Sequence, residues 1–170
     1  MLALLLSVGG LSHAGAPLSS ISLKAEHILK FAHYVEWPTR AFENPASPIV
    51  IGVMGEAALA DELARIAVSQ QIEGRPVSIK QLAAEDKSAP VHILFVGSHA
   101  GSAARDWLDP VETRPRLNIC DTSQELGQAC AIQFVEDSQR LRFDISVPAA
   151  ERSGVRIMAP LLTVARKVHK

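Results

Sequence analysis

The apolar residues of the segment 24–38 recur three or four positions apart, which places their side chains on one face of a helix. They are Ile28, Phe31, Ala32 and Val35. Pro38 cannot continue a helix and disfavours helical geometry at the residue before it. The pattern therefore predicts an amphipathic helix that ends near Glu36, with Ser22 as a candidate N-cap.

Later in the chain, short and almost wholly apolar runs predict strands that are covered on both faces. Strands are predicted over 49–54, over 91–96, over 116–120, and around Val77 and Ile79 after a turn at Glu73–Gly74. Helices are predicted over 56–68, over 98–108 and, at the close, over 157–168. Two more strands, 129–136 and 141–147, flank a connection of hairpin length.

Strands that alternate with helices favour parallel pairing through crossover helices, whereas the late hairpin adds antiparallel strands. The sequence therefore predicts a single α/β domain with a mixed, mostly parallel sheet of five or six strands. Helices are expected on both faces of this sheet, and a C-terminal hairpin plus helix should complete it.

The first 16 residues differ in character from the rest. An apolar block over 2–11 precedes the small residues Ala14-Gly15-Ala16, a pattern typical of a secretory signal peptide and its cleavage site. No Lys or Arg precedes the block, so we expect the true start of translation to lie upstream. The alternative is a buried N-terminal helix. With a signal peptide over 1–16, the mature domain is 17–170, and the protein is expected to be exported from the cytosol.

Composition fits one globular domain. The 170 residues carry a formal charge of −1, with 48% hydrophobic and 21% charged residues. A chain so close to neutral lacks the basic excess of proteins that bind nucleic acid, so no nucleic-acid partner is expected.

Two cysteines remain in the expected mature domain, Cys120 and Cys130. In an exported protein such a pair usually oxidises, so we expect a disulfide between them. The alternative is two free, buried thiols that act as small hydrophobic side chains. No nearby histidine completes a metal site with them.

Catalytic motifs are not apparent. Gly52–Gly55 and Gly97–Gly101 match neither a dinucleotide-binding loop nor a P-loop, and tight turns are the simpler interpretation. Ser98 directly follows Gly97, which does not fit a nucleophile elbow. His92, within a predicted strand, is interpreted as an outward or hydrogen-bonded core residue. We therefore expect a protein that is not an enzyme and needs no cofactor or metal.

Several segments together resemble the YfiR family of small bacterial periplasmic proteins. The resemblance begins with Phe31-Ala32-His33-Tyr34-Val35-Glu36-Trp37-Pro38, which matches the family's Glu-Trp-Pro signature at the end of its first helix. It continues through 49–55, 91–96, 141–147, 153–157 and 160–168. Two positions depart from the family pattern: Ser146 stands where Asn is usual, and Met158–Ala159 replace a pair of serines.

This resemblance implies a periplasmic regulator. The best-known type binds the periplasmic domain of an inner-membrane diguanylate cyclase and holds it inactive, which lowers cyclic di-GMP signalling and biofilm formation. Release involves an outer-membrane lipoprotein and redox or envelope stress, and members can form homodimers. The alternative function is a periplasmic small-molecule-binding module with an apolar pocket near Trp37.

Three residues are candidates for binding a partner or ligand. Trp37 is either a recognition residue or a core anchor, because large aromatic side chains dominate both settings. Arg156 precedes the predicted last helix and is expected to face a pocket near Glu36 if the first and last helices are neighbours.

Overall fold

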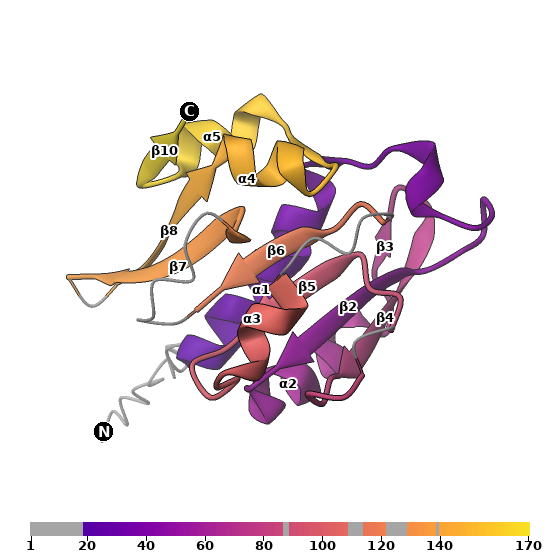
Figure 1. Ribbon diagram of the computed structural model, residues 1–170, viewed down its shortest axis with the longest axis horizontal. Helices are drawn as coiled ribbons and strands as arrows, with labels where there is room; N and C mark the ends of the chain where they lie inside the picture. The colour runs from indigo at the N-terminus through magenta and orange to yellow at the C-terminus, as the bar shows by residue number, and fades with distance from the viewer. Residues whose placement is uncertain (1–18, 87–88, 109–113, 122–128, 139) are drawn as a thin grey trace, which may run out of the picture.

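The computed structural model describes residues 19–86, 89–108, 114–121, 129–138 and 140–170 (Figure 1). The helices are α1 (Ser20–His33), the 3₁₀ helix η1 (Thr39–Ala41), α2 (Ala57–Ala67), α3 (Ala103–Leu108), α4 (Val147–Arg152) and α5 (Ala159–Val164). The strands are β1 (Val35–Glu36), β2 (Ile49–Met54), β3 (Gln71–Ile72), β4 (Arg75–Gln81), β5 (Ile93–Val96), β6 (Leu117–Cys120), β7 (Ile132–Asp137), β8 (Arg140–Ser146), β9 (Arg156–Ile157) and β10 (Lys167–His169).

Eight of the described strands form one mixed sheet, in the order β10-β8-β7-β6-β5-β2-β4-β3. Neighbours are parallel from β4 through to β7, and β10 also runs parallel to β8. The β7–β8 hairpin and the short β3–β4 pair are antiparallel. The predicted mixed, mostly parallel sheet is confirmed, but it has eight strands, because β3 and β10 are edge strands too short to stand out in the sequence.

Helices cover both faces of the sheet, as predicted (Figure 1). On one face, α1 and α2 pack against the inward side chains of the strands and form the larger hydrophobic core. On the other face, α3 covers a smaller core that includes Trp107 and both cysteines. Among the five parallel strands, β4 lies on one side of β2, whereas β5, β6 and β7 follow in turn on its other side. This strand order is that of a doubly wound sheet.

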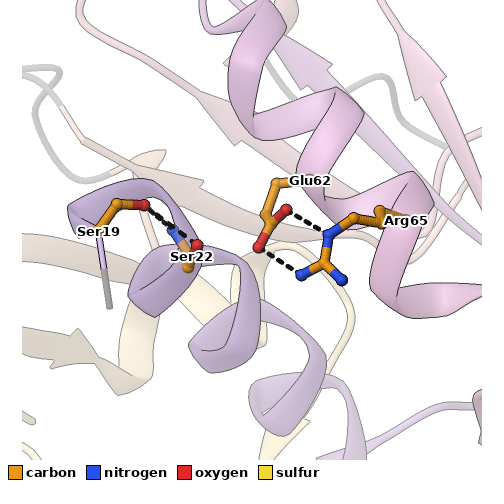
Figure 2. Close-up of polar contacts among 4 residues, drawn as sticks. All are labelled: Ser19, Ser22, Glu62 and Arg65. Atoms are coloured by element: carbon orange, nitrogen blue, oxygen red, sulfur yellow. Dashed lines mark hydrogen bonds and ion pairs between the residues drawn. The ribbon is translucent and has the colours of Figure 1, made fainter. Parts of the chain in front are cut away.

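The first two helices lie side by side (Figure 2). Ser19 caps α1 by accepting a hydrogen bond from the backbone N–H of Ser22 at 3.1 Å, so the cap lies three residues before the predicted Ser22. On α2, Glu62 accepts two hydrogen bonds of 2.8 Å from Arg65. The Arg65 guanidinium, and after it the Ser22 hydroxyl, lower the pKa of Glu62 to about 2.

The first helix ends at His33, earlier than the prediction near Glu36. Val35 and Glu36 instead form β1, which pairs antiparallel with β9 far along the chain. In this pairing the backbone groups of Val35 and Glu36 find hydrogen-bond partners on β9. In a longer helix they would have bonded to the preceding turn of the same helix. The prediction was wrong there because the competing strand lies more than a hundred residues away.

The prediction of one closing helix over 157–168 was also wrong. Ile157 belongs to β9, the helix α5 covers only Ala159–Val164, and 167–169 form the edge strand β10. The backbone N–H of Arg166 donates to the carbonyl of Phe143 on β8, so the chain leaves the helix there and joins the sheet.

A further helix, α4, directly follows β8 and is capped by Ser146, whose hydroxyl accepts from the N–H of Ala149. Because Ser and Asn are both good N-cap residues, the departure from the family pattern at Ser146 keeps this cap.

The predicted signal peptide, 1–16, lies outside the described residues, as does the segment 122–128. Within the part of the chain that the structure describes, no helix has the length and apolar character needed to cross a membrane.

Candidate partner-binding groove

The short β1–β9 ladder brings two of the predicted site residues together. Val35 lies opposite Ile157 and both are buried, whereas Glu36 lies opposite Arg156 and both point outward. Side chains alternate across a strand, so this register places the charged pair on the open side of the ribbon. The Arg156 Nη1 atom lies 3.6 Å from the Glu36 Oε2 atom, and the two side chains are 76% and 52% exposed. An ion pair this exposed adds at most about 1 kcal/mol and is readily exchanged for a partner's charges.

Beside this pair lies an open groove of about 510 Å³. It is lined by Glu36, Trp37, Pro38, Glu151, Gly154, Val155 and Arg156. All three residues that the sequence indicated therefore border one concave surface. The groove combines an aromatic ring with two carboxylates and one guanidinium, a mixture that suits recognition of another protein.

Trp37 belongs to both the core and the groove. Its partly buried ring packs against the larger hydrophobic core while part of it lines the groove. The ring makes edge contacts with Phe42 and His92, at centroid distances of 6.3 and 6.0 Å. Its indole nitrogen is buried and has no hydrogen-bond partner among the described residues. Core anchoring is thus shown, and recognition by Trp37 stays a prediction.

The His92 side chain packs against Trp37 and is held in place by two hydrogen bonds. The backbone N–H of Val50 donates to His92 Nδ1 at 3.0 Å, so this nitrogen carries no proton, and Nε2 donates to the carbonyl of Ala41, also at 3.0 Å. The Phe42 ring stacks on the imidazole with centroids 4.8 Å apart. Burial lowers the pKa of His92 and outweighs the Ala41 carbonyl, which raises it. His92 is therefore a hydrogen-bonded core histidine, one of the two interpretations drawn from the sequence.

Arg75 contacts the loop that carries Phe42. Its guanidinium lies 3.6 Å from the centre of the Phe42 ring, a cation–π contact. The same group donates hydrogen bonds to the carbonyls of Asn44 and Ser47, at 3.1 and 2.9 Å. Arg75, at the start of β4, thereby ties the loop 42–47 to the sheet. The Trp37 ring, which lines the groove, packs against Phe42 of this loop.

Other candidate chemistry is not assembled. Ser98 Oγ lies 3.3 Å from His99 Nδ1, and Glu56 Oε2 lies 4.0 Å from the same nitrogen. A catalytic triad needs the hydroxyl and the carboxylate on opposite nitrogens of the imidazole, so this cluster cannot relay a proton in that way. No group of three or more His, Cys, Asp or Glu side chains among the described residues is arranged to hold a metal ion.

Cys120 and Cys130 form the predicted disulfide, with Cα atoms 5.9 Å apart. The bond joins the end of β6 to the residues just before β7, so it closes the connection between two parallel strands. Next to it, Asp121 forms an ion pair with Lys24 of α1. The disulfide is part of the smaller core beneath α3.

A comparison with protein families matches residues 21–166 to the YfiR/HmsC-like family. The chain belongs to this family. The match covers the groove, the disulfide and the whole sheet apart from β10. Membership indicates a regulatory rather than a catalytic protein, with the periplasm as its place of action. A comparison with curated proteins gives no significant match.

Sequence reasoning missed Glu151 and Phe42, and it did not connect His92 with Trp37. Glu151 lies on α4, a six-residue helix that no periodicity indicated. Phe42 sits in a loop, where an isolated aromatic residue gives no sign of its neighbours. The Pro at the start of α4, Pro148, was the one available signal, since Pro is common in the first turn of a helix.

Proposed function

We propose that this protein binds the periplasmic domain of an inner-membrane diguanylate cyclase and holds the enzyme inactive. Its action lowers cyclic di-GMP signalling and so restrains biofilm formation. The observation that carries the proposal is the family match over 21–166, supported by a groove that joins the family's Glu-Trp-Pro turn to Arg156. An outer-membrane lipoprotein competes for the regulator and releases the cyclase. Homodimer formation is a further expectation.

Repression requires differential affinity: the regulator must bind the inactive state of the sensor more tightly than the active state. The groove supplies contacts suited to this task. Trp37 offers an aromatic surface, while Glu36, Glu151 and Arg156 offer charges that a partner can complement. Charges at the rim of an interface act mainly on partner choice and on the rate of association.

A charge swap tests the groove. In the variant with Glu36→Arg and Arg156→Glu, the ion pair between opposed residues of β1 and β9 is retained, but the charges offered to a partner are inverted. We expect this variant to keep its thermal stability and to bind the cyclase domain at least about tenfold more weakly. Binding is measured by biolayer interferometry with the periplasmic part of a cyclase encoded beside this gene.

Lys80→Ala is the matched control, because Lys80 is an exposed cation near the end of β4 and does not line the groove. It should bind as the unaltered protein does. Equal affinity for the charge-swapped and unaltered proteins would exclude the groove as the contact surface. Absence of any binding, with the disulfide either oxidised or reduced, would refute the proposed function itself.

The alternative, a small-molecule-binding module at Trp37, makes a different prediction. The groove is large enough for a ligand but is open and carries charged residues beside the aromatic ring. A thermal-shift screen against amino acids, nucleotides and cofactors separates the two functions. A ligand that stabilises the protein and whose effect disappears in Trp37→Ala would favour the alternative.

A further inference from the structure

One end of the sheet, formed by β7, β8 and β10, has an uncovered face (Figure 1). Side chains alternate along β8, so Leu141, Phe143 and Ile145 enter the larger core, and the residues between them lie on the opposite face. None of the side chains on that face belongs to the smaller core beneath α3, and most of them are exposed. We call this surface the open face; by the strand register its residues are Gln133, Val135 and Asp137 of β7, Arg140, Arg142, Asp144 and Ser146 of β8, and Lys167 and His169 of β10.

Positive charge exceeds negative charge on the open face. Glu136 lies on the other face of the β7–β8 hairpin. Arg152 of α4, at the border of the open face, has a partner of its own within the fold and adds no free charge. The whole chain has a formal charge of −1. On or beside the open face, in contrast, the described cations are Arg140, Arg142, Arg166 and Lys167, and the described carboxylates are Asp137 and Asp144.

Three of these cations are not paired. Arg166 donates two hydrogen bonds to Asp144, at 2.8 and 2.6 Å, so this ion pair is neutral as a whole. Among the residues that the structure describes, Arg140, Arg142 and Lys167 form no ion pair. A single carboxylate remains to offset these three exposed cations. The open face therefore presents a net positive charge to the solvent.

The open face lacks the apolar centre that protein partners usually recognise. The large apolar side chains that are exposed in the described part of the chain are Tyr34, Val68 and Val164, and none of them lies on this face. Its one apolar residue, Val135, is partly buried. Protein interfaces normally have aromatic or aliphatic residues at the centre and charges at the rim. A bilayer of anionic lipids, in contrast, attracts Lys and Arg side chains that are spread over a surface, and it requires no pocket.

We propose that the open face docks on the surface of an anionic phospholipid bilayer through Arg140, Arg142 and Lys167. Each Lys or Arg close to such a surface strengthens binding by about fivefold, so three of them strengthen it by about a hundredfold. A contact of this strength is reversible. It is also independent of the proposed protein partner, because none of the residues that line the partner-binding groove lies on the open face.

Sedimentation with lipid vesicles tests the proposal. The full, oxidised protein is mixed with vesicles of phosphatidylglycerol and phosphatidylcholine in equal parts, and in parallel with vesicles of phosphatidylcholine alone. We expect stronger binding to the anionic vesicles at low salt. This difference should disappear at about 1 M salt, where the Debye length is about 3 Å. The neutral vesicles also measure any adsorption through apolar segments of the chain.

Removing two of the charges, in the variant with Arg142→Gln and Lys167→Gln, should weaken binding to the anionic vesicles by about 25-fold. The matched control carries Lys30→Gln and Lys80→Gln, which remove the same charge from exposed positions on α1 and β4. It should bind as the unaltered protein does. If Arg142→Gln disturbs the hairpin, Lys167→Gln alone should still weaken binding by about fivefold. Equal binding to anionic and neutral vesicles at low salt, or equal losses in the double variant and its control, would overturn the proposal.

A soluble polyanion separates a bilayer from an acidic protein as the occupant of the open face. Poly-glutamate is titrated into the same proteins and followed by calorimetry. Binding of poly-glutamate that the double variant loses, together with no sedimentation by the anionic vesicles, would overturn the proposal and assign the open face to an acidic protein. Sedimentation with the anionic vesicles that the double variant loses and the control keeps supports docking on a bilayer, with or without binding of poly-glutamate.

Discussion

His92 is held in its neutral form by its neighbours. Val50 donates to one ring nitrogen, so that nitrogen must remain unprotonated, and burial together with the positive charges of Arg75 and Arg114 disfavours the imidazolium. The Phe42 and Trp37 rings both contact His92, so protonation of His92 would disturb the packing of these rings beside the groove.

The pH dependence of stability follows from this arrangement. In the unfolded chain the His92 side chain takes up a proton as the pH falls through the ordinary pKa of histidine, about 6.5. In the folded protein the pKa of His92 is lower, so this side chain stays unprotonated to a lower pH. The unfolded state then binds more protons, so the free energy of unfolding decreases below pH 6.5, by at most about 1.4 kcal/mol per pH unit. Above that pH the contribution is constant.

Denaturant titrations between pH 7.5 and 5 measure this slope, and His92→Asn should reduce it, because the Asn amide oxygen still accepts from Val50 and does not titrate. The favourable contribution of Glu62 does not enter this window, since it is lost only as the pH falls from about 4.5 to about 2. An equal slope in the variant would show that other groups cause the pH dependence.

At the scale of elements, the turns after β2 and β5 pack directly on each other. Gly55 has a φ of +74°, and a Cβ atom there would lie 2.3 Å from the backbone nitrogen of Ala100. Gly101 also has a positive φ, of +60°, but a Cβ there would meet nothing within 4 Å. Both glycines are therefore needed for backbone conformation, and Gly55 alone is also needed for the close approach of the two turns.

These two glycines form a matched pair for mutation. Gly101→Ala should cost about 1 kcal/mol of stability, from the left-handed backbone alone. Gly55→Ala should cost at least about 2 kcal/mol more, because the backbone of the neighbouring turn must move. Thermal or denaturant unfolding of both variants measures the difference. Similar losses would mean that the turn at 97–101 yields easily to the added methyl group.

The elements that the sequence predicted are those with strong local signals. The apolar runs of β2 and β5 and the periodicity of α2 extend over enough residues to be recognised without knowing their neighbours. The sequence did not indicate the short strands β1, β3, β9 and β10 or the helix α4, which are two to six residues long. The four strands exist only because a partner strand lies beside each of them. Local pattern cannot indicate such pairing.

The candidate groove shows the same division. Arg156 was expected to face a pocket near Glu36 because of neighbouring helices. It does border a groove beside Glu36, but the cause is the register of β1 against β9. Glu151 became a lining residue through α4, whose existence depends on the Ser146 cap at the end of β8. The family resemblance identified the Glu-Trp-Pro turn, whereas the shape of the groove required the three-dimensional arrangement.

At the scale of the whole molecule, the disulfide and the groove lie at opposite ends of β6. Cys120 is the last residue of this strand, whereas Arg116, just before its first residue, donates from its backbone to the carbonyl of Ser153 beside the groove. We therefore expect reduction of the disulfide to affect the groove through the stability of the whole fold rather than through a direct contact. Whether redox state alters the proposed repression then depends on how much stability the disulfide supplies.

The chain-entropy model gives an answer that can be measured. The two cysteines are 10 positions apart, and closing a loop of this size stabilises the folded state by about 2.5–3 kcal/mol. Denaturant titrations of the oxidised protein, the reduced protein and the variant with Cys120→Ala and Cys130→Ala should show this loss in both altered forms. Affinity for the cyclase domain, measured well below the unfolding midpoint, should change less than about twofold. A large loss of affinity in a reduced protein that is still fully folded would instead require a direct structural link along β6 from the disulfide to the groove.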